Sequence, residues 1–101
     1  MYVVSLHYTV PAEEISLMLP DHSNWINRHY RTHDFIAAGR CPTQTGAIII
    51  ARAMPRPRLD AILATDPLSL HHMVRADVIN FRALRTIPEL SQYADPLETS
   101  I

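Results

Sequence analysis

Histidine is the residue type in this chain best suited to acid–base chemistry, and three of the six histidines lie in the stretch DHSNWINRHYRTHDF (21–35). An imidazole ring titrates near neutral pH, and it can act as a general base, a metal ligand or a packed polar ring. At about 100° per residue on a helix, His22, His29 and His33 share one face with apolar side chains. We expect that face to contact a sheet, and packing with a hydrogen-bond partner is the ordinary role of a histidine there.

His22 differs from the other two histidines because we expect it at the start of a helix. Pro20 should end a first helix over 11–20, and Asp21 then takes the N-cap position of a second helix that runs to about Asp34. In the first turn, the helix dipole disfavours the imidazolium form, so His22 should stay neutral near pH 7. A neutral imidazole there can serve as a general base; the alternative is an exposed side chain without a function.

The stretch ATDPLSL (64–70) places Asp66 directly before Pro67. One interpretation is structural, because aspartate is a favoured N-cap and proline is favoured at the first position of the short turn that follows. The other is functional, because a carboxylate on this rigid turn can orient the His22 ring and stabilise its protonated form. The two interpretations are compatible, and the functional one predicts a catalytic pair of His22 and Asp66.

Three further residues are candidates for substrate binding. Arg40 follows Gly39 at the expected end of a strand, where its guanidinium can hold a phenolate or carboxylate; a surface ion pair is the alternative. Ser5 and His7 share one face of the first strand, and they either line the same cavity or lie in a dimer interface. Cys41 is the only cysteine, and we expect a small buried thiol rather than a nucleophile.

A metal site is not favoured by the spacing of the histidines. His29 and His33 are four residues apart and share a helix face, but the metalloprotease glutamate is missing and no third ligand is indicated. His71 and His72 are adjacent, so their side chains diverge on a helix or a strand. We therefore expect neither a metal ion nor another cofactor.

Composition limits the other classes of function. The 101 residues are 48% hydrophobic and carry a formal net charge of −1, which predicts one globular domain without a basic surface for nucleic acid. The absence of lysine excludes Schiff-base chemistry. No apolar run reaches the roughly 18 residues of a membrane-spanning helix. A single cysteine fits a reducing, cytoplasmic setting.

Hydrophobic periodicity and turn residues predict the order of the elements. We expect strands over 2–10, 35–41, 47–54 and 73–85. The first helical segment covers 11–34 and is divided at Pro20, and the second covers 55–66. A β-α-β-β-α-β order is the ferredoxin-like α+β arrangement, with helices on one face of the sheet. The other face stays bare, and pairing two sheets face to face in a homodimer would bury it. We assign residues 1–85 to this domain and 86–101 to a tail that packs loosely or reaches a partner.

The chain resembles the YCII-related (YciI-like) domain family over about residues 1 to 82. The resemblance rests on four short motifs in order: His22-Ser-Asn-Trp-Ile, Ile36-Ala-Ala-Gly39-Arg40, Thr45-Gly46 and Leu63-Ala-Thr-Asp66-Pro67-Leu68. It implies a dimeric α/β barrel and an active site around a His–Asp pair, which corresponds to His22 and Asp66. One member of that family is a dehydrochlorinase that acts on a chlorinated hydroxyhydroquinone.

Two classes of function remain open from the sequence. The first is a small-molecule enzyme, a lyase such as a dehydrochlorinase or an isomerase, which acts on a hydroxylated aromatic or enol through His22 and Asp66. The second is a non-catalytic homodimeric module that binds a small ligand or serves in assembly. Neither involves nucleic acid or a membrane.

Overall fold

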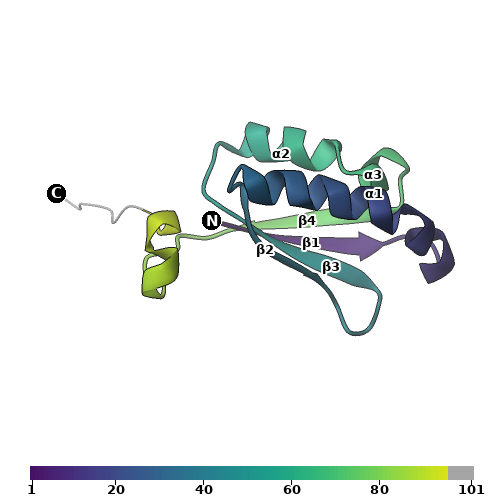
Figure 1. Ribbon diagram of the computed structural model, residues 1–101, viewed down its shortest axis with the longest axis horizontal. Helices are drawn as coiled ribbons and strands as arrows, with labels where there is room; N and C mark the ends of the chain where they lie inside the picture. The colour runs from purple at the N-terminus through teal and green to yellow at the C-terminus, as the bar shows by residue number, and fades with distance from the viewer. Residues whose placement is uncertain (96–101) are drawn as a thin grey trace.

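The computed structural model describes residues 1–95 and shows an α+β protein with two layers, an antiparallel sheet and a layer of helices on one face (Figure 1). The strands pair in the order β2-β3-β1-β4, which is compatible with the ferredoxin-like arrangement expected from the sequence. The elements are β1 (Tyr2–Tyr8), α1 (Ala12–Arg31), β2 (Phe35–Arg40), β3 (Gly46–Ala51), α2 (Arg56–Ala64), α3 (Pro67–Leu70), β4 (Val74–Asn80) and the 3-10 helix η1 (Pro88–Tyr93).

Helix α1 is continuous through Pro20, so the predicted break there and the N-cap role of Asp21 are wrong. A proline inside a helix removes one hydrogen bond and bends the axis, and the first turns of α1 bend away from the rest (Figure 1). Ile15 and Trp25 are buried on the two sides of the proline, and this packing holds both parts of the helix against the protein. The helix also ends at Arg31, so His33 lies outside it with a positive φ of 61°.

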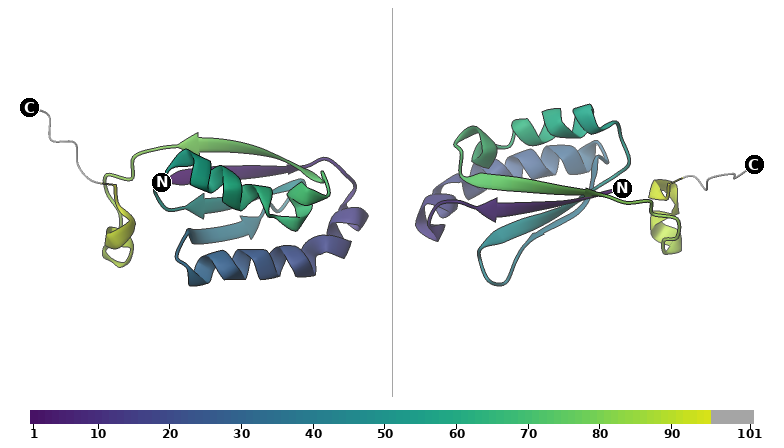
Figure 2. Two further views of the ribbon diagram at one scale, coloured as in Figure 1. Left: turned by 90° about the horizontal axis from the view of Figure 1, so that it is seen from above. Right: turned by 180° about the vertical axis from the view of Figure 1, so that it is seen from behind.

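The core lies between the sheet and the helices. Val4 and Leu6 of β1 are buried beneath the helices together with Ile49 of β3, and Trp25 of α1 packs against them. Figure 2 shows α1 and α2 lying side by side over this face of the sheet. Because successive side chains of a strand point to opposite faces, the even positions of β1 belong to the helix-covered face.

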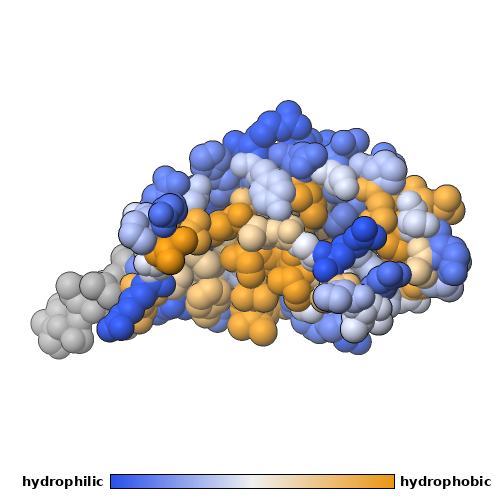
Figure 3. Space-filling view, turned by 60° about the horizontal axis from the view of Figure 1, so that its bottom comes forward, coloured by the Kyte–Doolittle hydropathy of each residue, from blue (hydrophilic) through white to orange (hydrophobic). Residues whose placement is uncertain are grey.

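The opposite face of the sheet carries no helix, and an apolar patch lies across it (Figure 3). The strand register aligns Val3 of β1 with Ile50 of β3 and Ile79 of β4, and Ile48 lies two residues from Ile50 on the same face. The side chain of Ile79 is 60% exposed. The prediction that this face remains bare in one protomer is confirmed within the described residues.

Strand β4 ends at Asn80, five residues before the predicted end, because its partner strand runs out. Tyr2 pairs with Asn80, and the last backbone bond of this edge runs from the Phe81 amide to the Met1 carbonyl. The chain then leaves the sheet and forms η1 at the end of the molecule (Figure 1).

Part of the expected tail is anchored rather than loosely packed. Asp95 Oδ2 accepts hydrogen bonds from the Ala83 amide at 2.6 Å and from the N-terminal ammonium of Met1 at 3.1 Å. The remainder of the predicted tail, residues 96–101, lies outside the described residues. Within residues 1–95, no helix has the length and apolar composition needed to cross a membrane.

Candidate functional site

His22 and Asp66 are 44 residues apart in the sequence and meet between α1 and α3. The distance between His22 Nδ1 and Asp66 Oδ1 is 2.8 Å, and their side chains are 7% and 1% exposed. Burial makes the contact strong, because little water competes for either group. The structure thus brings together the two residues that the sequence analysis proposed as an acid–base pair.

Asp66 is held in place by its role as the N-cap of α3, as predicted. Its Oδ1 also accepts the backbone N–H of Leu68 at 3.0 Å, and Pro67 occupies the first helical position. The side chain therefore has one rigid orientation, with Oδ1 shared between the helix end and His22. The second oxygen, Oδ2, is buried and has no hydrogen-bond partner among the described residues.

His22 lies in the middle of α1 and not at a helix start, so the predicted influence of the helix dipole is wrong. The dipole acts within the first or last turn only. The Asp66 contact replaces it: a carboxylate accepts hydrogen bonds, so Nδ1 carries the hydrogen and, in the neutral ring, Nε2 keeps a free lone pair. The Trp25 ring packs against the imidazole with 5.6 Å between centroids and restricts its rotation.

His22 lines a cavity of about 290 Å³ between α1 and the strands β2 and β3. Its wall is mixed: Leu19, Ile26 and Ile49 are apolar, and Arg40 adds a positive charge. A second cavity of about 490 Å³ lies toward the start of α1 and shares Leu19 and Arg40 with the first. His22 therefore borders a space large enough for a single aromatic ring, with a cation in its wall, and Asp66 lies behind His22.

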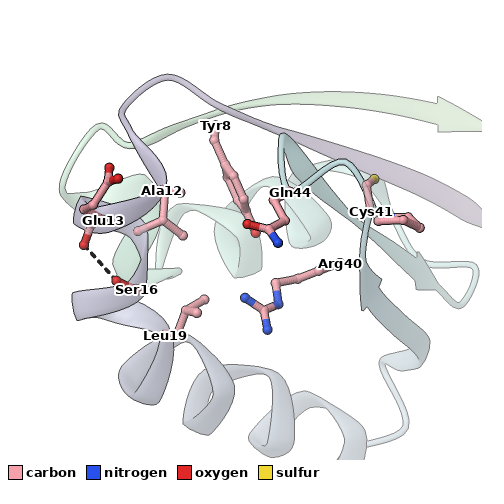
Figure 4. Close-up of a pocket in the computed structure, with 10 residues that line it drawn as sticks. Tyr8, Ala12, Glu13, Ser16, Leu19, Arg40, Cys41 and Gln44 are labelled. Carbon is pink, nitrogen blue, oxygen red and sulfur yellow. Dashed lines mark hydrogen bonds between the residues drawn. The ribbon is translucent and has the colours of Figure 1, made fainter.

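Arg40 is placed as the sequence analysis expected, at the end of β2. It pairs in register with Ala47, which faces the helices, so its side chain lies on the same side of the sheet as His22. Figure 4 shows its guanidinium pointing into the space between α1 and the sheet. Among residues 1–95, Arg40 makes no salt bridge, so the alternative of a surface ion pair finds no partner there.

Tyr8 is a cavity residue that the sequence analysis missed. It ends β1 on the helix-covered face and lines the larger cavity with Arg40 (Figure 4). Burial raises the pKa of the Tyr8 hydroxyl, with the nearby Arg40 charge opposing that shift. From the sequence, Tyr8 resembled a core residue, because it is largely apolar and occupies an even position of the strand. The placement could have been inferred from the topology. Strands β1 and β2 both run antiparallel to β3, so Tyr8 and Arg40, which end them, lie at the same end of the sheet.

Ser5 and His7 lie on the bare face of the sheet, away from His22 and Asp66. Ser5 Oγ and His7 Nε2 are 3.2 Å apart, and His7 Nε2 lies 3.0 Å from Asp77 of β4. Neither residue lines the cavity beside His22 or the larger cavity beside Tyr8. Asp77 also lies 3.6 Å from the Arg75 guanidinium of the same strand.

The other histidines of the first stretch have structural contacts. His29 packs between Trp25 and Phe35, and burial lowers the pKa of its ring. His33 Nδ1 lies 3.0 Å from the Tyr93 hydroxyl. Within residues 1–95 no three histidine, cysteine or acidic side chains cluster in a way that suits a metal ion.

No protein family and no curated protein matches this sequence. The resemblance to the YCII-related domain therefore rests on its four motifs, and the His22–Asp66 contact is the observation that bears on what the site can do.

Proposed function

We propose that this protein is a small-molecule enzyme of the YCII-related type, a lyase such as a dehydrochlorinase or an isomerase. Its substrate is a hydroxylated aromatic, with or without chlorine, or an enol. The observation that carries this proposal is the buried 2.8 Å contact between His22 and Asp66 beside a ring-sized cavity. A base held in one tautomer by a buried carboxylate is the arrangement that proton abstraction requires.

In this mechanism, Nε2 of His22 takes a proton from the substrate and Asp66 stabilises the imidazolium through Nδ1. In a dehydrochlorination, the substrate reacts as its dione tautomer, in which the chlorinated carbon and its neighbour are sp3. The electron pair of the broken C–H bond beside the carbonyl then forms a C=C bond while the C–Cl bond breaks, chloride leaves with its pair, and a quinone results. In an isomerisation, His22 returns the proton to another atom of the same substrate. A positioned acid–base group contributes about 10² to 10⁴ in rate, which suits a reactive substrate.

The proposal includes a homodimer in which two bare sheet faces pack together. The apolar face formed by Val3, Ile48, Ile50 and Ile79 supports it, since a monomer would leave that surface in water. Replacing Ile79 with Asp should convert a dimer to a monomer in light scattering at micromolar concentration. Leu17→Asp is the matched control, because Leu17 is 80% exposed on α1. A monomeric wild-type protein would contradict this part of the proposal.

The enzymatic part is tested by His22→Gln and Asp66→Asn in assays of chlorinated and unchlorinated hydroxyquinols, with chloride release and ring absorbance as readouts. Both variants should lose about 10² to 10⁴ in kcat. His71→Gln is the matched control, because His71 is exposed at the end of α3. Unchanged rates in His22→Gln would remove this residue from the mechanism.

A non-catalytic binding module would give a different pattern. Ligands of the panel would then raise the midpoint of thermal unfolding without any product formed, and His22→Gln would alter affinity alone.

A further inference from the structure

Two hydrogen-bond donors at one end of the sheet have no partner among residues 1–95. Tyr8 and Arg40 extend from the ends of β1 and β2 toward one cavity (Figure 4). Among residues 1–95, neither the Tyr8 hydroxyl nor the Arg40 guanidinium makes a hydrogen bond. Glu13 is the carboxylate in the wall of this cavity, and its side chain points away from Arg40 in Figure 4.

The chemistry of these two groups selects for an anion. A guanidinium donates hydrogen bonds and accepts none, and it binds planar carboxylates with two parallel bonds. The Tyr8 hydroxyl keeps its hydrogen near neutral pH, because the ordinary pKa of tyrosine is already about 10 and burial raises the pKa further. Both groups therefore offer hydrogen to a ligand, and one of them adds a positive charge.

The same two residues lie next to the acid–base pair. Arg40 also lines the smaller cavity, in whose wall His22 lies. Leu19 lines both cavities as well, so the two cavities are neighbours. Tyr8 lines the larger cavity, which meets the His22 cavity at Leu19 and Arg40. A ligand whose anionic group contacts Arg40 can therefore place an apolar ring beside His22.

We propose that Tyr8 and Arg40 form the binding site for an anionic group, a carboxylate or a phenolate, of the substrate on which His22 acts. The inference rests on the proposed function and narrows its substrates to small aromatic or enolic anions. Tyr8 and Arg40 fix the orientation of the ring, and the apolar wall of Leu19, Ile26 and Ile49 excludes a second charged substituent there.

The experiment measures the binding of three probes to the full-length protein by NMR titration. The probes are benzoate, 4-nitrophenolate at a pH where it is ionised, and neutral benzyl alcohol. Wild type should bind at least one anion about tenfold more tightly than benzyl alcohol. Arg40→Gln should lower the affinity for that anion by tenfold or more, and Arg40→Lys should lower it by less. Tyr8→Phe should lower the affinity by about threefold to tenfold.

Matched controls are Arg56→Gln and Tyr93→Phe, which change an arginine and a tyrosine outside both cavities and should leave affinity unchanged. Retained amide spectra show that each variant is folded. A carboxylate site gives selective binding of benzoate, and a phenolate site gives selective binding of 4-nitrophenolate. Equal affinity for all three probes, no binding at millimolar concentration, or unchanged affinity in Arg40→Gln would each overturn the inference.

Failure of this inference can be distinguished from failure of the proposed function. Anion binding that depends on Arg40, without turnover of any hydroxyquinol, would support the anion site and contradict the enzyme. If His22→Gln abolishes turnover but Arg40→Gln leaves the KM unchanged, the result would support the enzyme and contradict the anion site.

Discussion

Trp25 donates a hydrogen bond from Nε1 to Thr65 Oγ1 at 3.0 Å, and this bond joins the two segments that carry the dyad. Trp25 is fully buried and lies three residues after His22 on α1, whereas Thr65 directly precedes Asp66. The Thr65 hydroxyl in turn donates to the Ile62 carbonyl at 2.7 Å, which fixes its orientation. The spacing between His22 and Asp66 therefore depends on a second contact one helical turn away.

Replacing Thr65 with Val should loosen the dyad without touching either member. The indole N–H loses its acceptor, so we expect the free energy of unfolding to fall by about 1–2 kcal/mol. The hydrogen on His22 Nδ1 should also exchange faster with water, because the Asp66 carboxylate is less firmly positioned. Urea unfolding measures the first effect and proton NMR the second. Thr65→Ser keeps the hydroxyl and is the control; equal behaviour of the two variants would contradict a positioning role.

The order of strands and helices could be predicted from sequence because β-branched runs, prolines and turn residues each act locally. Strand ends were less certain, since the end of β4 depends on where its partner β1 begins. The break at Pro20 was predicted from a local rule, and tertiary burial of Ile15 and Trp25 overrode it. Local signals thus predict which elements exist, and long-range packing decides where they end.

The candidate site was predictable in part for the same reason. Asp66 shows a local N-cap signature, and its capping bond to Leu68 is present. Its distance to His22 depends on how α1 crosses α3, which no short stretch of sequence encodes. Tyr8 was missed because a tyrosine at an apolar strand position is usually a core residue, and its place beside Arg40 follows only from the sheet topology.

His29 should make the protein sensitive to mild acid. Burial is the main cause that lowers the pKa of its ring in the folded state; Arg28 and Arg58 add to the shift and Asp34 opposes it. Its Nδ1 lies 3.9 Å from Asp34 Oδ2, too far for a hydrogen bond.

A lowered folded-state pKa means that the unfolded chain binds the proton more readily. Stability is then full above the unfolded value near 6.5 and falls as the pH drops through the lowered folded pKa. Between pH 7 and pH 5, wild type should lose more free energy of unfolding than His29→Phe, as measured by urea unfolding at each pH. His71→Gln should follow wild type. Parallel curves for wild type and His29→Phe would refute the assignment.

Asp95 should stabilise the protein at neutral pH by joining the C-terminal segment to the N-terminus. The pKa of its carboxyl is lowered, first by the hydrogen bond from the Ala83 amide and then by the Met1 ammonium and Arg82. Asp95→Asn should cost about 1–2 kcal/mol at pH 7, because it removes the charge from these contacts.

The sign of the pH dependence follows from the lowered pKa. The Asp95 contribution is present above its ordinary value of 3.8 and is lost as the pH falls through the lower folded value. Wild type and Asp95→Asn, both with an untagged N-terminus, should therefore converge in thermal unfolding toward pH 3. Asp60→Asn removes an exposed ion pair with Arg56 and should change stability little at any pH.

The two glycines of the chain should respond oppositely to alanine, although they lie near each other at one end of the sheet. A Cβ on Gly46 would collide with the backbone carbonyl of Leu6 and lie 3.6 Å from the His7 Cα, so strand β1 would have to move. Gly46→Ala should then destabilise the protein by about 1–3 kcal/mol in urea unfolding. It should also weaken binding at the Tyr8 cavity, because Tyr8 follows His7 on the displaced strand.

Gly39→Ala is the matched variant of this pair, since a Cβ there meets nothing within 4 Å in one chain and Gly39 has no positive φ. Reduced freedom of the unfolded chain should raise stability by about 0.4–1 kcal/mol. Similar losses of stability in both variants would show that any side chain at this end of the sheet is unfavourable, which contradicts the specific role of Gly46. A loss confined to Gly46→Ala would show that the close approach of β3 to β1 positions the end of β1, and with it the Tyr8 side chain.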